Sequence, residues 1–169
     1  MVGYALSCGT CDRVDVVPVV HHRFSKQLSS FAERVHWCRL AFAIYGDRVR
    51  VALDEADNPS GATYDMVLRR QQQNPLEVHR LLLGSDLLSG TERWLNFQAL
   101  CALAPPLIIG RAGHPVPRAW SDQHPGTQVL PAEVPDISSS WIRKQLIAHA
   151  DVQGWVPAAV LAAMQGRAS

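Results

Sequence analysis

Three serines and an arginine lie close together near the carboxyl end of the chain, in the segment Ile137-Ser138-Ser139-Ser140-Trp141-Ile142-Arg143. Serine hydroxyls at a helix start accept hydrogen bonds from backbone N–H groups that have no partner within the helix. The same N–H groups, with the positive end of the helix dipole, also attract a phosphate. Arg143 lies one turn further, where a guanidinium can bind two phosphate oxygens. The segment predicts either a capped helix or a phosphate site formed by Ser138, Ser139, Ser140 and Arg143.

A second group of candidate residues follows an apolar run, where Leu83-Gly84-Ser85-Asp86 is followed eight residues later by Trp94. If the run is a buried parallel strand, Asp86 lies at the carboxyl edge of the sheet, where open α/β folds bind their ligands. A carboxylate at that edge commonly accepts hydrogen bonds from ribose hydroxyls. Trp94 has two interpretations, because its ring either packs in the core or covers an aromatic ring of a ligand.

A third group is basic and follows the strand expected to end near Val20, in the segment His21-His22-Arg23-Phe24-Ser25-Lys26. Lys26 is the candidate for contact with an anion, and the alternative is a solvated loop. Adjacent histidines point in different directions and no carboxylate lies near them in the sequence, so we assign no metal ligand here. The chain also has a Cys8-Gly9-Thr10-Cys11 pair, but without a second close pair it predicts loop thiols in a reducing compartment rather than a zinc site.

Helical and strand patterns alternate along the whole chain, which predicts an α/β fold with helices on the faces of a parallel sheet. Strands are predicted at 14–20, 48–53, 79–86 and 107–110, and helices at 28–44, 63–73, 92–104, 138–149 and 157–165. Five prolines between residues 112 and 135 predict that this stretch holds no long element. Because no repeat or linker divides the chain, we expect a single domain over residues 1–169.

Composition narrows the classes of function. The 169 residues are 47% hydrophobic and 18% charged, and 16 basic against 15 acidic residues give a net charge of +1. A disordered chain is excluded, and no bulk attraction to nucleic acid or to an anionic membrane is expected. No apolar run reaches the length of a membrane span, and the first residues lack a basic leader, so the predicted location is the cytoplasm.

Taken together, these segments resemble the nicotinate-nucleotide adenylyltransferase family of the nucleotidyltransferase superfamily, over nearly the whole chain. The stretches 16–18, 22–26 and 31–34 are similar to the family's second strand, lysine loop and following helix. Residues 61–65 resemble its Ser-Tyr-Thr-x-Asp-Thr segment, with Ala62 and Met66 replacing a tyrosine and a threonine. Residues 84–86, Trp94, 108–111 and Gly113 follow the family's sequence from ribose site to arginine. Residues 137–143, 151–152 and 155–160 match its Ile-Ser-Ser-Thr-x-Ile-Arg motif and C-terminal helix.

The resemblance implies a Rossmann-like nucleotidyltransferase fold and a reaction. AMP would pass from ATP, accompanied by Mg²⁺, to nicotinate mononucleotide, giving the deamido-NAD dinucleotide and pyrophosphate. The residues implied to bind ATP are Lys26, Asp86, Arg111, Ser138, Ser139, Ser140 and Arg143. Thr63 would contact the mononucleotide, and Trp94 would stack on its pyridine ring. Neither a nucleic acid nor a membrane is implied as a partner.

One departure from the family affects catalysis. Family members begin with a strand that runs into a Gly-x-Phe-x-Pro-x-His-x-Gly-His turn, whose histidines hold the triphosphate, and the sequence contains no such turn. We therefore assign no catalytic residue and expect negligible adenylyltransferase activity from the chain as written. Residues 1–7 resemble the helix after that turn, so we expect a chain truncated at its N-terminus relative to the family. The missing strand would lie between those at 14–19 and 80–83 and leave two edges unpaired.

Two alternatives stay open. The first is a non-catalytic nucleotide-binding remnant, which the missing turn favours. The second is another adenylyl- or cytidylyltransferase, such as a phosphopantetheine adenylyltransferase, because such enzymes share the serine–arginine motif. The spacing between Asp86 and Trp94 favours the pyridine nucleotide over this second alternative.

Overall fold

The computed structural model describes residues 1–20 and 29–165, and the chain forms two units that are interleaved in sequence. Unit 1 comprises Met1–Asp12 and Asp54–Asp136, and unit 2 comprises Arg13–Leu53 and Ile137–Ser169. The expectation of a single domain stays a prediction. No helix among the described residues is long and apolar enough to cross a membrane.

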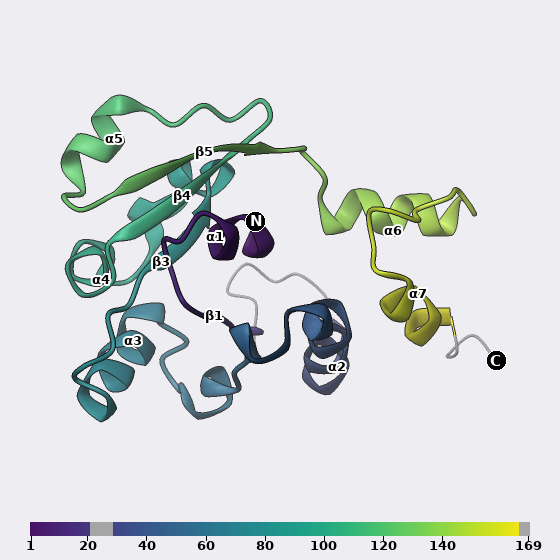
Figure 1. Ribbon diagram of the computed structural model, residues 1–169, viewed down its shortest axis with the longest axis horizontal. Helices are drawn as coiled ribbons and strands as arrows, with labels where there is room; N and C mark the ends of the chain where they lie inside the picture. Colours follow the sequence, from purple (N-terminus) through teal and green to yellow (C-terminus); the bar gives the residue numbers. More distant parts are fainter. Residues whose placement is uncertain (21–28, 166–169) are drawn as a thin grey trace. The chain divides into compact units, whose positions relative to one another are not determined.

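Unit 1 is built on a three-stranded parallel sheet in the order β3-β4-β5 (Figure 1). The strands are β3 (Leu81–Gly84), β4 (Pro106–Arg111) and β5 (Gln128–Val134). The central strand is the most apolar, and Leu107, Ile108 and Ile109 are each exposed by 2% or less. A register shift follows Ile109, where a Cβ on Gly110 would lie 2.9 Å from the backbone oxygen of Ala132. Glycine is therefore required where β4 approaches β5.

Helices cover the sheet of unit 1. The short helix α1 (Val2–Ser7) packs Ala5 against Leu107, Ile109 and Leu130. Ile108 points to the opposite face, because side chains alternate along a strand. The helices α3 (Thr63–Gln73) and α4 (Phe97–Leu103) pack against each other. Unit 1 also contains the 3₁₀ helices η2 (Asp54–Asp57) and η3 (Ser85–Arg93), and the helix α5 (Arg118–Gln123).

Unit 2 combines a parallel strand pair with helices. The strands are β1 (Val14–Val16) and β2 (Val49–Val51), and Asp15 on β1 is bound by Arg50 on β2 at 2.6 Å. The helix α2 (Phe31–Phe42) begins with a capping box formed by Ser30 and Glu33, and it packs against α7 (Ala158–Gln165). The remaining elements are the 3₁₀ helix η1 (Ala43–Arg48) and the helix α6 (Ser139–Ile147).

The predicted α/β class with parallel strands is confirmed, and the helix predicted at 63–73 has the bounds of α3. The strand predicted at 14–20 is too long, because Pro18 has no N–H to donate to a ladder and β1 ends at Val16. The helix predicted at 92–104 is wrong in its first half. Asn96 has a left-handed φ of 54°, so α4 begins only at Phe97, after η3 has ended at Arg93.

The prediction that residues 112–135 hold no long element is also wrong. This stretch contains α5 and the seven-residue strand β5, which includes Pro131. In the described three-stranded sheet β5 pairs with β4 and is an edge strand. An edge strand can accommodate a proline without losing a hydrogen bond of the ladder. Pro117 stands directly before α5, at a helix start, where the missing N–H has no helical partner to lose.

Candidate functional site

Arg111 joins two carboxylates where the strands of unit 1 end. It is the last residue of β4, and its Nη1 lies 3.0 Å from Oδ2 of Asp86, which follows β3. Its Nε lies 2.9 Å from Oδ1 of Asp136, which follows β5. The Arg111 side chain is only 18% exposed and Asp86 24%, whereas Asp136 is 58% exposed. The sequence predicted Asp86 and Arg111, and the structure brings them into direct contact.

The backbone around this ion pair is fixed by Ser85. The Ser85 hydroxyl is buried, donates to the carbonyl of His114 at 2.6 Å and accepts from the backbone N–H of Arg111 at 2.8 Å. Gly84 leaves the space that the neighbouring carboxylate uses, because a Cβ on Gly84 would lie 2.5 Å from Oδ1 of Asp86. The end of β3 therefore holds both partners of the pair.

Trp94 lines a hollow of about 430 Å³ in unit 1. The wall residues are Glu92, Trp94, Phe97, Gln98, Gln123 and His124. Phe97 meets the Trp94 ring edge to face, with centroids 5.7 Å apart, and meets His124 in the same way at 5.3 Å. Trp94 is half-buried, so the ring takes part both in packing and in the wall of the hollow.

Gln123 and His124, at the end of α5, also line this hollow, and they lie in the stretch where no long element was predicted. The Trp120 ring stacks on His124 at 4.1 Å, and its Nε1 donates to the buried hydroxyl of Thr91 at 3.1 Å. Nδ1 of His124 lies 2.7 Å from the carbonyl oxygen of Trp120. Because a carbonyl only accepts, Nδ1 carries a proton there, and in the neutral ring Nε2 is then an acceptor.

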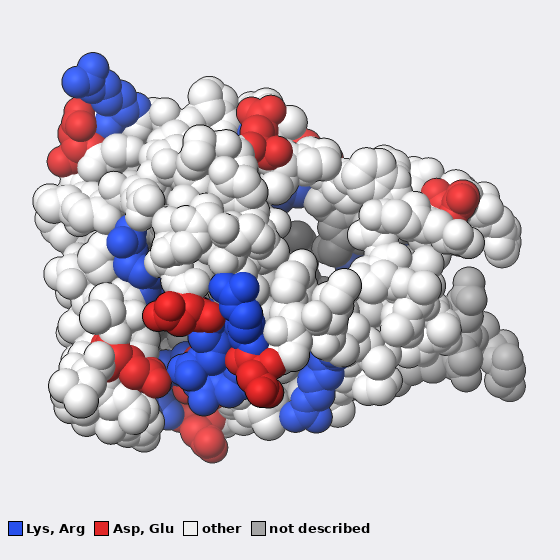
Figure 2. Space-filling model, in the orientation of Figure 1, with Lys and Arg blue, Asp and Glu red and all other residues white. Residues whose placement is uncertain are grey.

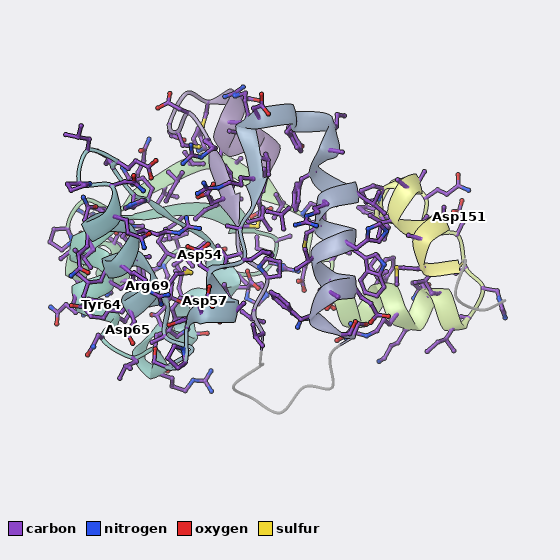
Figure 3. The ribbon with its side chains drawn as sticks, turned by 90° about the horizontal axis from the view of Figure 1, so that it is seen from below. Asp54, Asp57, Tyr64, Asp65, Arg69 and Asp151 are labelled. Carbon is purple, nitrogen blue, oxygen red and sulfur yellow. The ribbon has the colours of Figure 1, made fainter. Side chains whose placement is uncertain are left out.

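Thr63, the other residue expected to contact the mononucleotide, is the first residue of α3. The loop before it is held by the buried Asn58, whose amide donates to Oε1 of Glu55 and to the carbonyl of Ala62, both at 3.1 Å. Arg69 on α3 donates to the carbonyl of Asp57 at 2.7 Å, and Figure 3 shows these two residues side by side. The position of Thr63 is thus set by a hydrogen-bonded loop of unit 1.

The serine segment lies in unit 2 and begins α6. The Ser138 hydroxyl accepts from the backbone N–H of Trp141 at 3.1 Å, which confirms the capped-helix interpretation. The Ser140 hydroxyl accepts from Nη2 of Arg143, also at 3.1 Å. Ser138, Ser139, Ser140 and Arg143 are all exposed, so a solvent-borne anion can reach them. Lys26 lies outside the described residues, as do His21 and His22.

Three residues of the site in unit 1 were not singled out from the sequence. Asp136 binds Arg111, and Trp120 stacks on His124, which lines the hollow. Asp136 could have been found, because it stands directly before the segment that begins at Ile137. Trp120 and His124 were missed because prolines on both sides of them predict a loop.

Metal ligands, thiols and surface charges among the described residues also bear on the chemistry. Within the part of the chain that the structure describes, no three His, Cys, Asp or Glu side chains are grouped so that they could hold a metal ion. Burial raises the pKa of the Cys101 thiol to about 11, so at neutral pH this thiol on α4 is protonated and a poor nucleophile. Figure 2 shows basic and acidic side chains next to each other on a mostly uncharged face, which agrees with the net charge of +1.

Sequence comparison identifies relatives over most of the chain. A scan against protein-family models finds no match. A protein of Anaeromyxobacter dehalogenans, named a probable nicotinate-nucleotide adenylyltransferase, is 35% identical over 161 residues, covering 94% of this chain and 80% of the relative. This chain belongs to the nicotinate-nucleotide adenylyltransferase family. A Klebsiella pneumoniae protein of the same name is 29% identical over 174 residues, and the match covers 88% of this chain and 79% of that relative.

Solved structures agree with the family assignment in fold. The nicotinic acid mononucleotide adenylyltransferase of Plasmodium falciparum complexed with NaAD superimposes with a TM-score of 0.71 at 20% identity, covering 85% of this chain and 73% of the other. The same enzyme complexed with APC gives a TM-score of 0.73 at 19% identity, covering 91% and 79%. The predicted Rossmann-like nucleotidyltransferase fold and the family that the sequence resembles are both confirmed.

Proposed function

We propose that this chain binds ATP and nicotinate mononucleotide and serves the transfer of AMP from one to the other. A phosphate oxygen of the mononucleotide attacks the α-phosphorus of ATP, the bond from that phosphorus to the β-phosphate oxygen breaks, and pyrophosphate leaves. The products are deamido-NAD and pyrophosphate. The observation that carries the proposal is the hollow lined by Trp94, in a chain of the nicotinate-nucleotide adenylyltransferase family.

Trp94 and Thr63 are the proposed contacts for the mononucleotide. A pyridine ring is flat and aromatic, and it fits against the half-buried ring of Trp94 in an offset or edge-to-face arrangement. Phe97 packs against the ring of Trp94, and His124, which also lines the hollow, is stacked on Trp120. A wall that is rigid before the ligand arrives loses little conformational entropy on binding.

The proposed ATP contacts are Lys26, Asp86, Ser138, Ser139, Ser140 and Arg143, with Arg111 beside Asp86. The exposed first turn of α6 offers backbone N–H groups, serine hydroxyls and a guanidinium to phosphate oxygens. Asp86 offers a carboxylate to a ribose hydroxyl. Catalysis by such groups is chiefly positioning and charge stabilisation.

Mg²⁺ is proposed to arrive with ATP, as part of the substrate. Magnesium prefers oxygen ligands, and nucleotide phosphates supply them alongside water and one or two carboxylates. Its role would be to reduce the repulsion between the phosphates and the incoming mononucleotide. Protein residues would then orient the nucleotide without a metal cage of their own.

A role in binding without turnover is the second candidate function. The observation that favours it is that the groups the structure describes, which are the exposed first turn of α6, Asp86 and the hollow lined by Trp94, are suited to binding and orientation. Both candidates require that ATP and the mononucleotide bind, and they differ only in the rate of pyrophosphate release.

The test is a titration of the protein and of Trp94→Ala with nicotinate mononucleotide and, separately, with ATP. Aromatic contacts are worth roughly 0.5–1.5 kcal/mol, so Trp94→Ala should weaken mononucleotide binding by about two- to tenfold and leave ATP binding unchanged. Trp155→Ala removes a half-exposed tryptophan from unit 2 and serves as the matched control for the mononucleotide, whose affinity should stay unchanged. Equal mononucleotide affinity in parent and Trp94→Ala would contradict the proposed site.

A further inference from the structure

We propose that Arg111 acts on the nucleotide through Asp86: it is a positioning residue that aims the Asp86 carboxylate at a ribose hydroxyl, and it is not itself a phosphate ligand. This inference rests on the proposed function, because it takes Asp86 as the ribose contact. It changes the role that the resemblance implied for Arg111, which was direct contact with ATP.

The charge around Arg111 disfavours a phosphate. Arg111 contributes one positive charge, and its Nη1 and Nε face Asp86 and Asp136 at 3.0 and 2.9 Å. The three side chains together carry a net charge of −1, which repels a triphosphate rather than attracting it. Charge-assisted hydrogen bonds of this kind are about twice as strong as neutral ones, so breaking them to reach a phosphate would be costly.

Arg111 is also held in place on both its backbone and its side chain. Its backbone N–H is fixed by the buried Ser85 hydroxyl at 2.8 Å, and its side chain is only 18% exposed. Arg143, by contrast, is exposed and donates to a neutral hydroxyl of Ser140. Of these two arginines, Arg143 is the one that can turn toward a phosphate without leaving a carboxylate unpaired.

The orientation of Asp86 leaves it able to accept from a ligand. Its Oδ2 accepts from Arg111, and its Oδ1 lies 2.5 Å from the place a Cβ on Gly84 would take. Each carboxylate oxygen has two lone pairs, so Asp86 can accept from a hydroxyl while it remains bound to Arg111. The carboxylate is thus bound by a guanidinium on β4, and it occupies the space that a side chain at Gly84 would take.

The test compares ATP with 2′-deoxy-ATP and 3′-deoxy-ATP in equilibrium titrations of the parent, Asp86→Asn and Arg111→Lys. A hydrogen bond to a charged group is worth roughly 1.5–3 kcal/mol, so the parent should bind one of the two deoxy nucleotides about tenfold more weakly than ATP. Lysine keeps the charge but cannot reach two carboxylates in the planar geometry of arginine. We expect the preference for the hydroxyl to fall to about threefold or less in Arg111→Lys, as in Asp86→Asn. Adenosine, which lacks phosphates, is titrated as well. In Arg111→Lys the ratio of ATP affinity to adenosine affinity should stay at its parent value.

Two further variants complete the design. Arg70→Lys is the matched control, because Arg70 also binds a carboxylate in unit 1, Asp54 at 2.6 and 2.7 Å, and the hydroxyl preference should stay intact. Gly84→Ala disturbs Asp86 while leaving Arg111 in place, and its φ of −79° is compatible with alanine. Gly84→Ala should lose the hydroxyl preference too, because its Cβ displaces the Asp86 carboxylate directly. If Arg111→Lys fails to fold, Arg111→Gln takes its place in the titrations and should lose the hydroxyl preference in the same way.

The outcomes separate the two proposals. No binding of ATP by the parent would remove the proposed function and this inference with it. A parent that prefers the hydroxyl, with Asp86→Asn losing that preference and a folded Arg111→Lys keeping it, would overturn the inference alone, whatever Gly84→Ala does. A second result would also overturn the inference. If Arg111→Lys lowers the affinity for ATP and for both deoxy nucleotides equally, and also lowers the ratio of ATP to adenosine affinity, Arg111 behaves as a phosphate ligand.

Discussion

Two arginines that the sequence assigned to the same ligand have different surroundings. Arg111 is held by Asp86 and Asp136, whereas Arg143 stands exposed on the first turn of α6 beside the Ser140 hydroxyl. A hydroxyl does not neutralise a guanidinium, so the charge of Arg143 remains available to an anion. The sequence could place both arginines at ends of elements where ligands bind, but their partners come from residues 25 and 3 positions away, and only the structure identifies the distant ones.

The prediction at this scale is that Arg143→Lys weakens ATP binding without unfolding α6. Lysine keeps the charge and the helix propensity but loses the planar pair of donors that matches two phosphate oxygens. Loss of one charge-assisted hydrogen bond should raise the dissociation constant of ATP by about tenfold, with nicotinate mononucleotide unchanged. Titration calorimetry measures both, thermal melting checks the fold, and Arg118→Lys on α5 is the exposed-arginine control. Unchanged ATP affinity in Arg143→Lys would remove the first turn of α6 from the proposed phosphate site.

At the scale of elements, the sequence predicted helix boundaries correctly where turn residues flank the helix. It failed where one residue with a non-helical conformation interrupts a helical pattern. The bounds of α3 follow from the turn residues before Thr63 and from Asn74-Pro75 after it. The segment 92–104 has helical spacing of apolar residues, yet Asn96 takes a left-handed conformation and splits it. Asparagine is tolerated both inside and outside helices, so its identity alone could not predict the break. The edge position that admits Pro131 to β5 is likewise a property of the whole sheet.

Substitution of Asn96 should test this break directly. Its φ of 54° suits glycine or asparagine and disfavours a β-branched residue. Asn96→Val should lower the free energy of unfolding by about 1–2 kcal/mol, and Asn96→Gly should leave it unchanged or raise it slightly. Urea unfolding followed by tryptophan fluorescence measures the difference. A valine variant as stable as the parent would mean that the segment from 92 to 104 tolerates a continuous helix.

For the whole molecule, the family assignment could be reached from the sequence because several weak motifs occur in the right order. No single motif would suffice, since serine-capped helices and strands that end in Gly-Ser-Asp occur in many folds. The order of the strands in each sheet was harder to predict, because pairing depends on contacts between residues far apart in the chain. β1 and β3, the two strands expected to flank a missing one, belong to different sheets among the described residues, and the expectation of a missing strand stays a prediction.

The last prediction concerns turnover by the 169-residue chain. The groups that the structure describes are suited to binding and orientation, and the sequence lacks the histidine turn with which the family is expected to hold the triphosphate. Loss of a single donor to developing charge typically costs about 10²–10³ in rate, and two histidines are missing. Pyrophosphate release from ATP, Mg²⁺ and nicotinate mononucleotide should therefore stay near background, in the same samples whose titrations show both nucleotides bound. Turnover of about 1 s⁻¹ or more would be an ordinary enzymatic rate and would show that other residues supply the charge. In that case His21 and His22, close to Lys26 in the sequence, would be the first to substitute by glutamine, because the family is expected to hold the triphosphate with imidazole side chains.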